Sequence, residues 1–499
     1  MSADVETDVV IVGYGPVGQA LATLLAQLGR RVTVLERWPA PYPLPRAVHF
    51  DHEVGRIFQA CGVGDELRAI SEPADLYEWR NAAGTTLLRF GQAGDGPSGW
   101  PASSMFNQPS AEKLLDRRAR HVGVDVRRGV EVVEIEQHDD RVVVGGTHVT
   151  PVSARYAVGC DGANSTVRSL AGLPVTDLGF FYDWLIVDVI LDEPRVFDPI
   201  NVQICDPARP TTAVSGGPGR RRWEFMRLPG ESLDDLGEEQ LAWKLLAPWD
   251  VHPGNAKLER HAVYTFSARC ADVWRARRVL VAGDAAHLMP PFAGQGMCSG
   301  LRDAANLAWK LDLLLGDLAT DDLLESYQSE RLPSVKAAIE FSMELGKVIC
   351  VPDPVEAAAR DEVMAAGVGE EPAPAPGLPA IGSGFIHPTA PHAGRQFVQG
   401  RVGGRLFDEV HGNGWRLVVL GASVEAVGSN ELAWFESIGG RVVRLADPDP
   451  LLVGWFAEHA TSYALQRPDF YLYGTAQTEE QTTTLLGDLR AHLSGRVTT

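Results

Sequence analysis

Features that define whole classes of protein are missing from this sequence of 499 residues. No apolar run approaches the roughly 18–20 uncharged residues that a membrane-spanning helix needs. The six cysteines are scattered and none forms a C-x-x-C pair, which argues against a disulfide framework, a zinc site and a dithiol redox centre. Basic residues are scarce: 45 Lys and Arg stand against 65 Asp and Glu, a formal net charge of −20. Such a chain lacks the basic footprint that nucleic-acid or anionic-membrane partners require.

The N-terminus carries no secretory signal, because its first six residues are acidic and lead directly into an expected strand. We therefore expect a cytoplasmic protein. Hydrophobic residues make up 45% of the chain and charged residues 22%, as in ordinary globular proteins. The length suffices for two or three domains, each with its own core. The negative charge implies that an anionic cofactor is held by local arginines and helix N-termini.

A nucleotide-binding motif occupies the N-terminal segment. Residues 8–12 form a β-branched run typical of a buried parallel strand, and G-x-G-x-x-G follows at 13–18. An apolar helical face and a second strand come next, and that strand finishes at Glu36. The glycines permit close approach of a pyrophosphate, the helix start faces its charge, and Glu36 can accept from a ribose hydroxyl, which favours FAD or NAD over NADP. The candidate cofactor-binding residues are Gly13, Gly15, Pro16, Val17, Glu36 and Arg37.

Two distant segments favour FAD over NAD. Residues 157–168 place a strand before D-G-x-x-S-x-V-R, with Asp161 as its acid, and residues 279–287 bring a strand to G-D-A-A-H. Asp284, at a strand's carboxyl end, is well placed to accept hydrogen bonds from ribityl hydroxyls. Pro290 and Pro291 make the chain rigid where it approaches the flavin ring, and the glycines at 294 and 296 let backbone amides come close to that planar ring. The N-terminus of the helix that follows carries partial positive charge, which stabilises the anionic reduced flavin. The candidates here are Gly283, Asp284, Gly294, Gly296, Met297 and Cys298 for the cofactor, Pro290 for catalysis and Pro291 for both.

The order and spacing of these three motifs resemble the class A flavoprotein aromatic hydroxylases of the p-hydroxybenzoate hydroxylase type, over roughly residues 5–345. The resemblance implies tightly but non-covalently bound FAD, transient reduction by NADH or NADPH, and O2 as co-substrate. In that family a flavin C4a-hydroperoxide transfers its distal oxygen to a phenolic ring. Positions that match single family residues imply further cofactor contacts at Arg46, Gln108 and Val132.

The chain departs from the family pattern at Cys298, where Asn is common. Its backbone N–H can still serve the flavin, and we expect the side chain to be a buried structural thiol. Gly216–Gly219 has no flanking strand and helix pattern, so a second dinucleotide site is not expected there. With neither that second domain nor a reactive cysteine pair, the sequence does not fit a flavin disulfide reductase.

Residues 176–270 alternate as strands, which predicts an antiparallel substrate sheet inserted between the flavin motifs, with 77–79 and 87–90 as candidate additions. His49, Asp51 and His52 follow Arg46 and can face the ring, and we take His49 and Asp51 as candidate catalytic side chains. Arg221 and Arg222 are candidates for holding a substrate carboxylate, although a solvated basic strand is the simpler interpretation. No metal site is expected.

The expected fold is α/β, with a doubly wound FAD-binding domain of the glutathione-reductase type in two parts, 1–175 and 271–350. The inserted substrate domain spans 176–270, a Pro-rich linker 351–395, and a thioredoxin-like domain 396–499. Because this last domain has no cysteine, dithiol chemistry is excluded and we expect a structural or subunit-contact role. The sequence is compatible with a homo-oligomer and does not determine the oligomeric state.

Segments 220–231 and 295–311 look closest to the 3-(3-hydroxyphenyl)propionate hydroxylase branch, which implies a phenol bearing an acidic side chain, hydroxylated ortho to its hydroxyl. One alternative is a tailoring hydroxylase acting on a larger secondary metabolite, such as a polyketide or pyridone ring. A flavin-binding prenyl reductase or halogenase is the alternative from another class. A halogenase is disfavoured because its Trp-x-Trp-x-Ile motif is absent.

Overall fold

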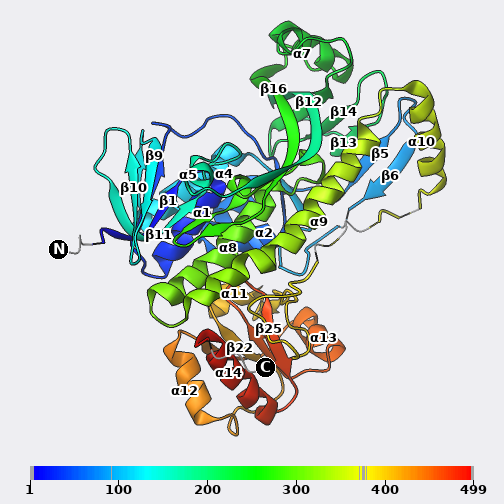
Figure 1. Ribbon diagram of the computed structural model, residues 1–499. Coiled ribbons are helices and arrows are strands. Elements are labelled where there is room, and N and C mark those ends of the chain that lie inside the picture. The colour runs from blue at the N-terminus through cyan, green and yellow to red at the C-terminus, as the bar shows by residue number, and fades with distance from the viewer. Residues whose placement is uncertain (1–4, 92, 370, 374–376, 378, 496–499) are drawn as a thin grey trace.

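The computed structural model describes residues 5–91, 93–369, 371–373, 377 and 379–495 (Figure 1). Two large sheets and the long helices α8 (Gly296–Leu315) and α9 (Glu325–Ile349) form the main body. Elements β20 to α14, residues 401–493, form a smaller C-terminal unit below these helices (Figure 1). None of the helices in the described part of the chain has both the length and the apolar character needed to cross a membrane.

The first sheet is built around β1 (Thr7–Val12), which pairs in parallel with β2 (Val32–Glu36) and β11 (Val152–Gly159). Its strands run in the order β17-β18-β11-β1-β2-β8, and β10 joins β9 to β11. Residues 9–12 are buried because helices cover this parallel sheet, as the continuous β-branched run predicts. Helix α1 (Pro16–Gln27) packs on α8. The other elements here are β8 (Asp125–Arg128), β9 (Val132–Gln137), β10 (Val142–Gly146), β17 (Arg275–Ala276), β18 (Val279–Val281), α4 (Gln108–His121) and α5 (Thr166–Leu170).

The second sheet runs in the order β19-β16-β12-β15-β14-β13-β5-β6. Its longest strands are β12 (Val175–Leu191) and β16 (Ala256–Ala271). The prediction that the segments around 77 and 88 join this sheet is confirmed, but β5 pairs with β13 in parallel, so the sheet is mixed rather than wholly antiparallel. The remaining elements are β5 (Tyr77–Arg80), β6 (Thr86–Phe90), β13 (Asn201–Ile204), β14 (Thr211–Ser215), β15 (Arg220–Met226), β19 (His287–Leu288), α6 (Leu233–Leu236) and α7 (Glu239–Leu246).

A small antiparallel sheet, β3-β7-β4, is formed by strands that lie between β2 and β8 in the sequence, and it carries His49 and Asp51 on β3 (His49–Asp51). Helix α2 (His52–Ala60) follows directly, capped by the Asp51 side chain, which accepts from the Val54 N–H at 3.1 Å. The cap turns the chain sharply at the strand end. The other elements are β4 (Ser71–Pro73), β7 (Ser103–Phe106) and α3 (Gly64–Ala69).

The segment predicted as a linker contains a helix, α10 (Pro354–Ala366), which packs against β6. Asp353 caps it by accepting from two backbone N–H groups, and Pro354 suits its first turn. The abundance of Pro and Ala in the surrounding segment obscured this start signal. The prediction of a linker at 351–395 did not include this helix.

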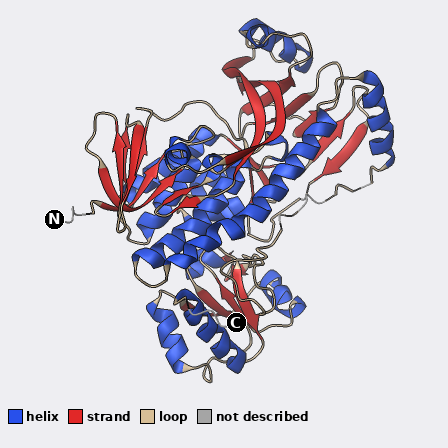
Figure 2. Cartoon of the chain, viewed as in Figure 1, coloured by secondary structure: helices blue, strands red, loops and turns tan. Residues whose placement is uncertain are grey.

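The C-terminal unit holds a sheet in the order β23-β22-β24-β25, flanked by helices (Figure 2). β22 and β23 are parallel, and the other neighbours are antiparallel. Its elements are β20 (Arg401–Val402), β21 (Arg405–Leu406), α11 (Phe407–His411), β22 (Arg416–Val419), α12 (Ser429–Ser437), β23 (Arg441–Arg444), α13 (Pro450–Glu458), β24 (Tyr463–Gln466), β25 (Leu472–Ala476) and α14 (Glu479–Leu493).

A buried ionic network docks this unit on α8 and α9. The Glu330 carboxylate of α9 binds Lys310 of α8 at 2.9 Å and Arg467 of the C-terminal unit at 2.7 Å. Arg467 also pairs with Asp469, and all four side chains are almost fully buried. Removing one partner from such a network costs about 3–5 kcal/mol, because a buried charge is left uncompensated. The network therefore specifies how the unit sits on the main body.

Candidate active site

A cavity of about 1060 Å³ is lined by loops that follow strands of the first sheet, by strands of the second sheet, by the start of α8 and by Tyr471 of the C-terminal unit. This is at the upper end of the roughly 300–1,000 Å³ typical of ligand pockets. The sequence-predicted residues that it brings together are Gly15, Pro16, Val17, Arg46, His49, Asp51, Gln108, Asp284, Pro291, Gly294, Gly296 and Met297.

The other predicted residues are not part of the cavity lining. Gly13 has φ +97°, and a Cβ there would lie 2.5 Å from the Cys160 carbonyl oxygen, so the turn requires glycine. Glu36 accepts from the Tyr14 N–H at 2.7 Å and so tightens the same turn. Arg37 is exposed, and its guanidinium lies over Trp38. The remaining members of this group are Val132, Asp161, Gly283, Pro290 and Cys298.

The thiol of Cys298 is fully buried, as predicted for a structural cysteine. It donates to the Gly294 carbonyl at 3.6 Å, and burial raises the pKa of this thiol far above its usual range. Asp161 binds the Ser165 hydroxyl and the Val167 N–H and thereby shapes the turn after β11. The carbonyl of Pro290 accepts from Ser342 of α9, which anchors the proline segment.

Two helices begin at the cavity without a side-chain cap: α1 after Gly15 and α8 after Gln295. The backbone N–H groups of a first helical turn have no acceptor within their own helix and carry partial positive charge, here toward the cavity. A Cβ on Gly15 would lie 3.6 Å from the Arg46 guanidinium, so this cation stands over the start of α1. The arrangement suits an anion at α1 and an electron-rich ring edge at α8.

The Asp284 carboxyl lines the cavity. In the sequence, Asp284 precedes the start of α8 by twelve residues. Burial raises its pKa, while Arg46 and His287 oppose that shift. Among the described residues its side chain has no hydrogen-bond partner, so it is free to accept from hydroxyl groups of a ligand. The uncapped helices, the glycine turns and this acceptor together fit a flavin dinucleotide.

The loop at Gly294 touches His49. The His49 Nδ1 atom lies 3.3 Å from the Gly294 carbonyl oxygen, and a Cβ at Gly294, where φ is +63°, would lie 2.8 Å from that nitrogen. Because a carbonyl only accepts, Nδ1 carries the proton and Nε2 keeps its lone pair. Burial lowers the pKa of His49, so the ring is neutral near pH 7.

Comparison with known proteins decides the family. A family model described as "FAD binding domain" matches residues 6–342. The chain belongs to this FAD-binding family, of the class A aromatic hydroxylase type. A probable NADH-specific resorcinol 4-hydroxylase of Rhodococcus jostii is 39% identical, over 97% of this chain and 94% of that protein. A 3-(3-hydroxy-phenyl)propionate/3-hydroxycinnamic acid hydroxylase of a Mycobacterium species is 34% identical, over 99% of this chain and 94% of that protein.

A solved flavin-dependent monooxygenase in complex with FAD and substrate has the same fold, with a TM-score of 0.82 at 20% identity, and the match covers 99% of this chain and 100% of that one. The prediction of an FAD-dependent aromatic hydroxylase is therefore confirmed at the level of the family. FAD is the cofactor that the uncapped helices and Asp284 fit in this hydroxylase.

Asp51, a candidate catalytic side chain from the sequence, is engaged by other residues of the protein. Its carboxylate binds Arg302 at 2.6 Å and Gln295 at 3.2 Å through one oxygen and caps α2 through the other. Arg302 outweighs burial and holds the pKa of Asp51 well below its usual range. A carboxylate so occupied is a poor base, and it instead positions the start of α8.

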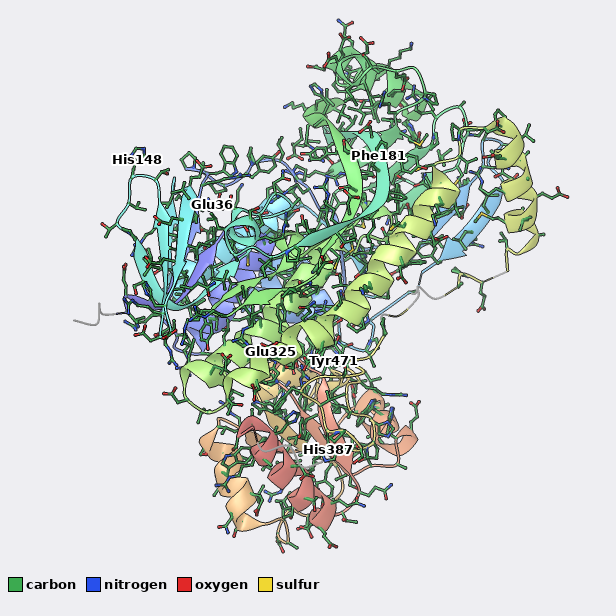
Figure 3. The ribbon with its side chains drawn as sticks, in the orientation of Figure 1. Glu36, His148, Phe181, Glu325, His387 and Tyr471 are labelled. Carbon is green, nitrogen blue, oxygen red and sulfur yellow. The ribbon has the colours of Figure 1, made fainter. Side chains whose placement is uncertain are left out.

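The sequence analysis did not identify the residues that hold Asp51 in place, which are Arg302, Glu53 and Tyr471. Arg302 also pairs with Glu53, and Glu53 accepts from the Tyr471 hydroxyl at 2.8 Å. Tyr471 belongs to the C-terminal unit and lies where that unit meets the long helices (Figure 3). The Arg-Pro-Asp-aromatic-Tyr stretch was visible at 467–471, but nothing in it pointed to the flavin side of the hydroxylase.

The interpretation of Arg221 and Arg222 as a solvated strand is wrong, because both side chains are buried. Their strand lies inside the second sheet, paired on both sides by β12 and β14. Arg222 lines the cavity together with Glu224, while Arg221 lies against Phe197. Neither residue faces solvent, and Glu224 had drawn no attention in the sequence.

Proposed function

We propose that this flavoprotein hydroxylates a phenolic ring, with NADH as electron donor and O2 as the source of the inserted oxygen atom. The observation that carries the proposal is the continuity of the cavity, which runs from the helix starts that suit FAD to a wall of the second sheet. Bound FAD supplies hydride acceptance and activation of O2. The preference for NADH rests on the NADH-specific relative described above.

The second sheet and α9 give the substrate end of the cavity an apolar lining. Such a lining excludes water, which protects a reactive oxygen species from loss and holds a flat ring by contact. Phe292 packs edge-on against Trp184 and Phe266 and so has a fixed orientation. The apolar residues of this wall are Val214, Leu288, Met289, Phe292, Phe341 and Leu345.

His49 is the residue that we assign to proton transfer. Its neutral ring has a free Nε2 lone pair, and it lines the cavity beside Gly294. When His49 accepts the phenolic proton at Nε2, the carbons of the substrate's phenol ring become more electron-rich. This favours their attack on an electrophilic oxygen. His52 is occupied differently, since its Nδ1 lies 3.1 Å from the Ser98 hydroxyl.

We also propose the domain division expected from the sequence, with α10 added inside the segment 351–395. The sheet order of the C-terminal unit, with one parallel and two antiparallel pairs of neighbouring strands, supports a thioredoxin-like assignment for 396–499.

A cytoplasmic location is supported by six cysteines that are all free. We also propose that FAD is contacted by the remaining residues predicted from the sequence, which are Arg37, Arg46, Gln108, Val132 and Asp161.

The test is substrate-stimulated oxidation of NADH by the purified yellow protein. We expect a phenol to accelerate NADH and O2 consumption, with hydroxylated product formed in equal amount. Oxidation that yields only hydrogen peroxide with every phenol tested would refute the proposal. Stimulation by polycyclic phenols but not by monocyclic ones would instead favour a tailoring hydroxylase of secondary metabolism.

A further inference from the structure

A buried carboxyl group, Glu224, stands on the substrate wall of the cavity. It lies on β15, where it pairs with Thr212 of β14 and Ile186 of β12. Its side chain is buried yet lines the cavity, as does that of Arg222 two residues earlier on the same face of the strand. The cavity therefore presents one carboxyl and one guanidinium side by side from β15.

The guanidinium of Arg222 is already occupied by the protein. It binds Asp188 through two nitrogens, at 2.7 and 3.1 Å, and donates to the carbonyls of Pro45 at 3.0 Å and Arg46 at 2.6 Å. Four of the five N–H groups of Arg222 are thus used. The closest distance between Arg222 and Glu224, from Nη1 to Oε1, is 3.8 Å. Arg222 holds the 45–46 loop in place and is not available to pair with a substrate carboxylate.

The charges around Glu224 balance without any ligand. Burial raises the pKa of Glu224, and Arg222 and Arg260 oppose that shift. Arg260 binds Asp188 at 2.9 Å, so once Glu224 is ionised, as at alkaline pH, the two cations Arg222 and Arg260 face two acids, Asp188 and Glu224. A substrate carboxylate placed here would add a buried negative charge with no counter-ion, which is strongly unfavourable. A neutral hydroxyl would meet no such penalty.

Glu224 itself has unused acceptor capacity. Among the described residues its carboxyl has no hydrogen-bond partner, and the neighbouring Thr212 hydroxyl donates to Gln203 at 2.6 Å instead. A buried acceptor of this kind favours a ligand that brings its own donor.

We propose that Glu224 selects the substrate by accepting a hydrogen bond from a second, uncharged donor on the phenolic ring and by repelling carboxylates. The substrate class is thus a neutral phenol with a further hydroxyl, such as a dihydroxybenzene, rather than a phenol with an acidic side chain. This inference rests on the proposed function and specifies which phenols satisfy it.

The experiment compares kcat/KM for coupled hydroxylation of resorcinol, phenol and 3-(3-hydroxyphenyl)propionate at mildly alkaline pH. The wild type should prefer resorcinol to the propionate by at least about 10-fold. Glu224→Met, which removes the acceptor, should lower kcat/KM for resorcinol about 10- to 100-fold and that for phenol much less. Glu224→Gln keeps the shape and an acceptor but removes the charge, so it should raise kcat/KM for the propionate.

Glu259→Gln is the matched control, because Glu259, on β16, pairs with Arg220 of β15 and lies outside the cavity lining. It should leave the substrate ratios unchanged. If phenols are hydroxylated but Glu224→Gln leaves the ratio of resorcinol to propionate unmoved, charge selection by Glu224 is wrong while the proposed function stands. If no phenol supports hydroxylation by the wild type, the proposed function itself fails.

Discussion

Tyr471→Phe removes a single hydroxyl that connects the C-terminal unit to the active site. That hydroxyl donates to Glu53 at 2.8 Å, and Glu53 shares Arg302 with Asp51 at the start of α8. The ring of Tyr471 remains in the variant, so packing is preserved and only the hydrogen bond is lost. We expect lower stability and a less firmly held α8 start.

The magnitude follows from the charge and burial of the acceptor. Glu53 is only 6% exposed, and a hydrogen bond to a charged group contributes about 1.5–3 kcal/mol. Water cannot readily replace the missing donor at so buried a carboxylate. We therefore expect the free energy of unfolding to fall by about 1.5–3 kcal/mol.

A double-mutant cycle with Glu53→Gln isolates this contact from other effects. Denaturant unfolding of the FAD-loaded protein should give a coupling energy between Tyr471 and Glu53 of about 1.5–3 kcal/mol. Tyr473→Phe is the control, because that hydroxyl lies 3.4 Å from His492 inside the C-terminal unit. The variant Tyr471→Phe should also divert more NADH to hydrogen peroxide. A coupling energy below about 0.5 kcal/mol, with unchanged peroxide yield, would show that the connection is unimportant.

Three further outcomes are expected. Burial holds the pKa of His49 below its ordinary 6.5, so kcat/KM should fall as the pH drops through that lowered pKa and the ring becomes charged; His49→Gln should be slow and lack this acidic limb. Asp284→Asn should weaken FAD binding about 10- to 100-fold in fluorescence titrations of the apoprotein, and unchanged affinity would contradict its role as an acceptor of hydroxyl groups. Gly294→Ala should displace His49, because the new Cβ would lie 2.8 Å from Nδ1 at a φ of +63°; product formation should then drop while FAD binding persists.

Local patterns in the sequence were sufficient for the nucleotide-binding half. The run of β-branched residues at 8–12, the glycines at 13, 15 and 18, and Glu36 produce a strand, turn, helix and strand whose geometry depends on neighbours in the chain. The motif around Asp284 was recognisable for the same reason, since its strand (residues 279–281) and the following helix (residues 296–315) lie close together in the sequence. These short-range patterns were sufficient to predict the family and the FAD cofactor.

Only the tertiary structure decided which charges are buried and what they bind. Tyr471 meets Glu53 across 418 positions of sequence, and Arg302 meets Asp51 across 251. Arg222 became a buried structural cation, and Glu224 a cavity residue, because flanking strands from elsewhere in the chain covered β15. The environment of a side chain is set by distant segments that close around it, and residue type and spacing along one strand contain no record of them.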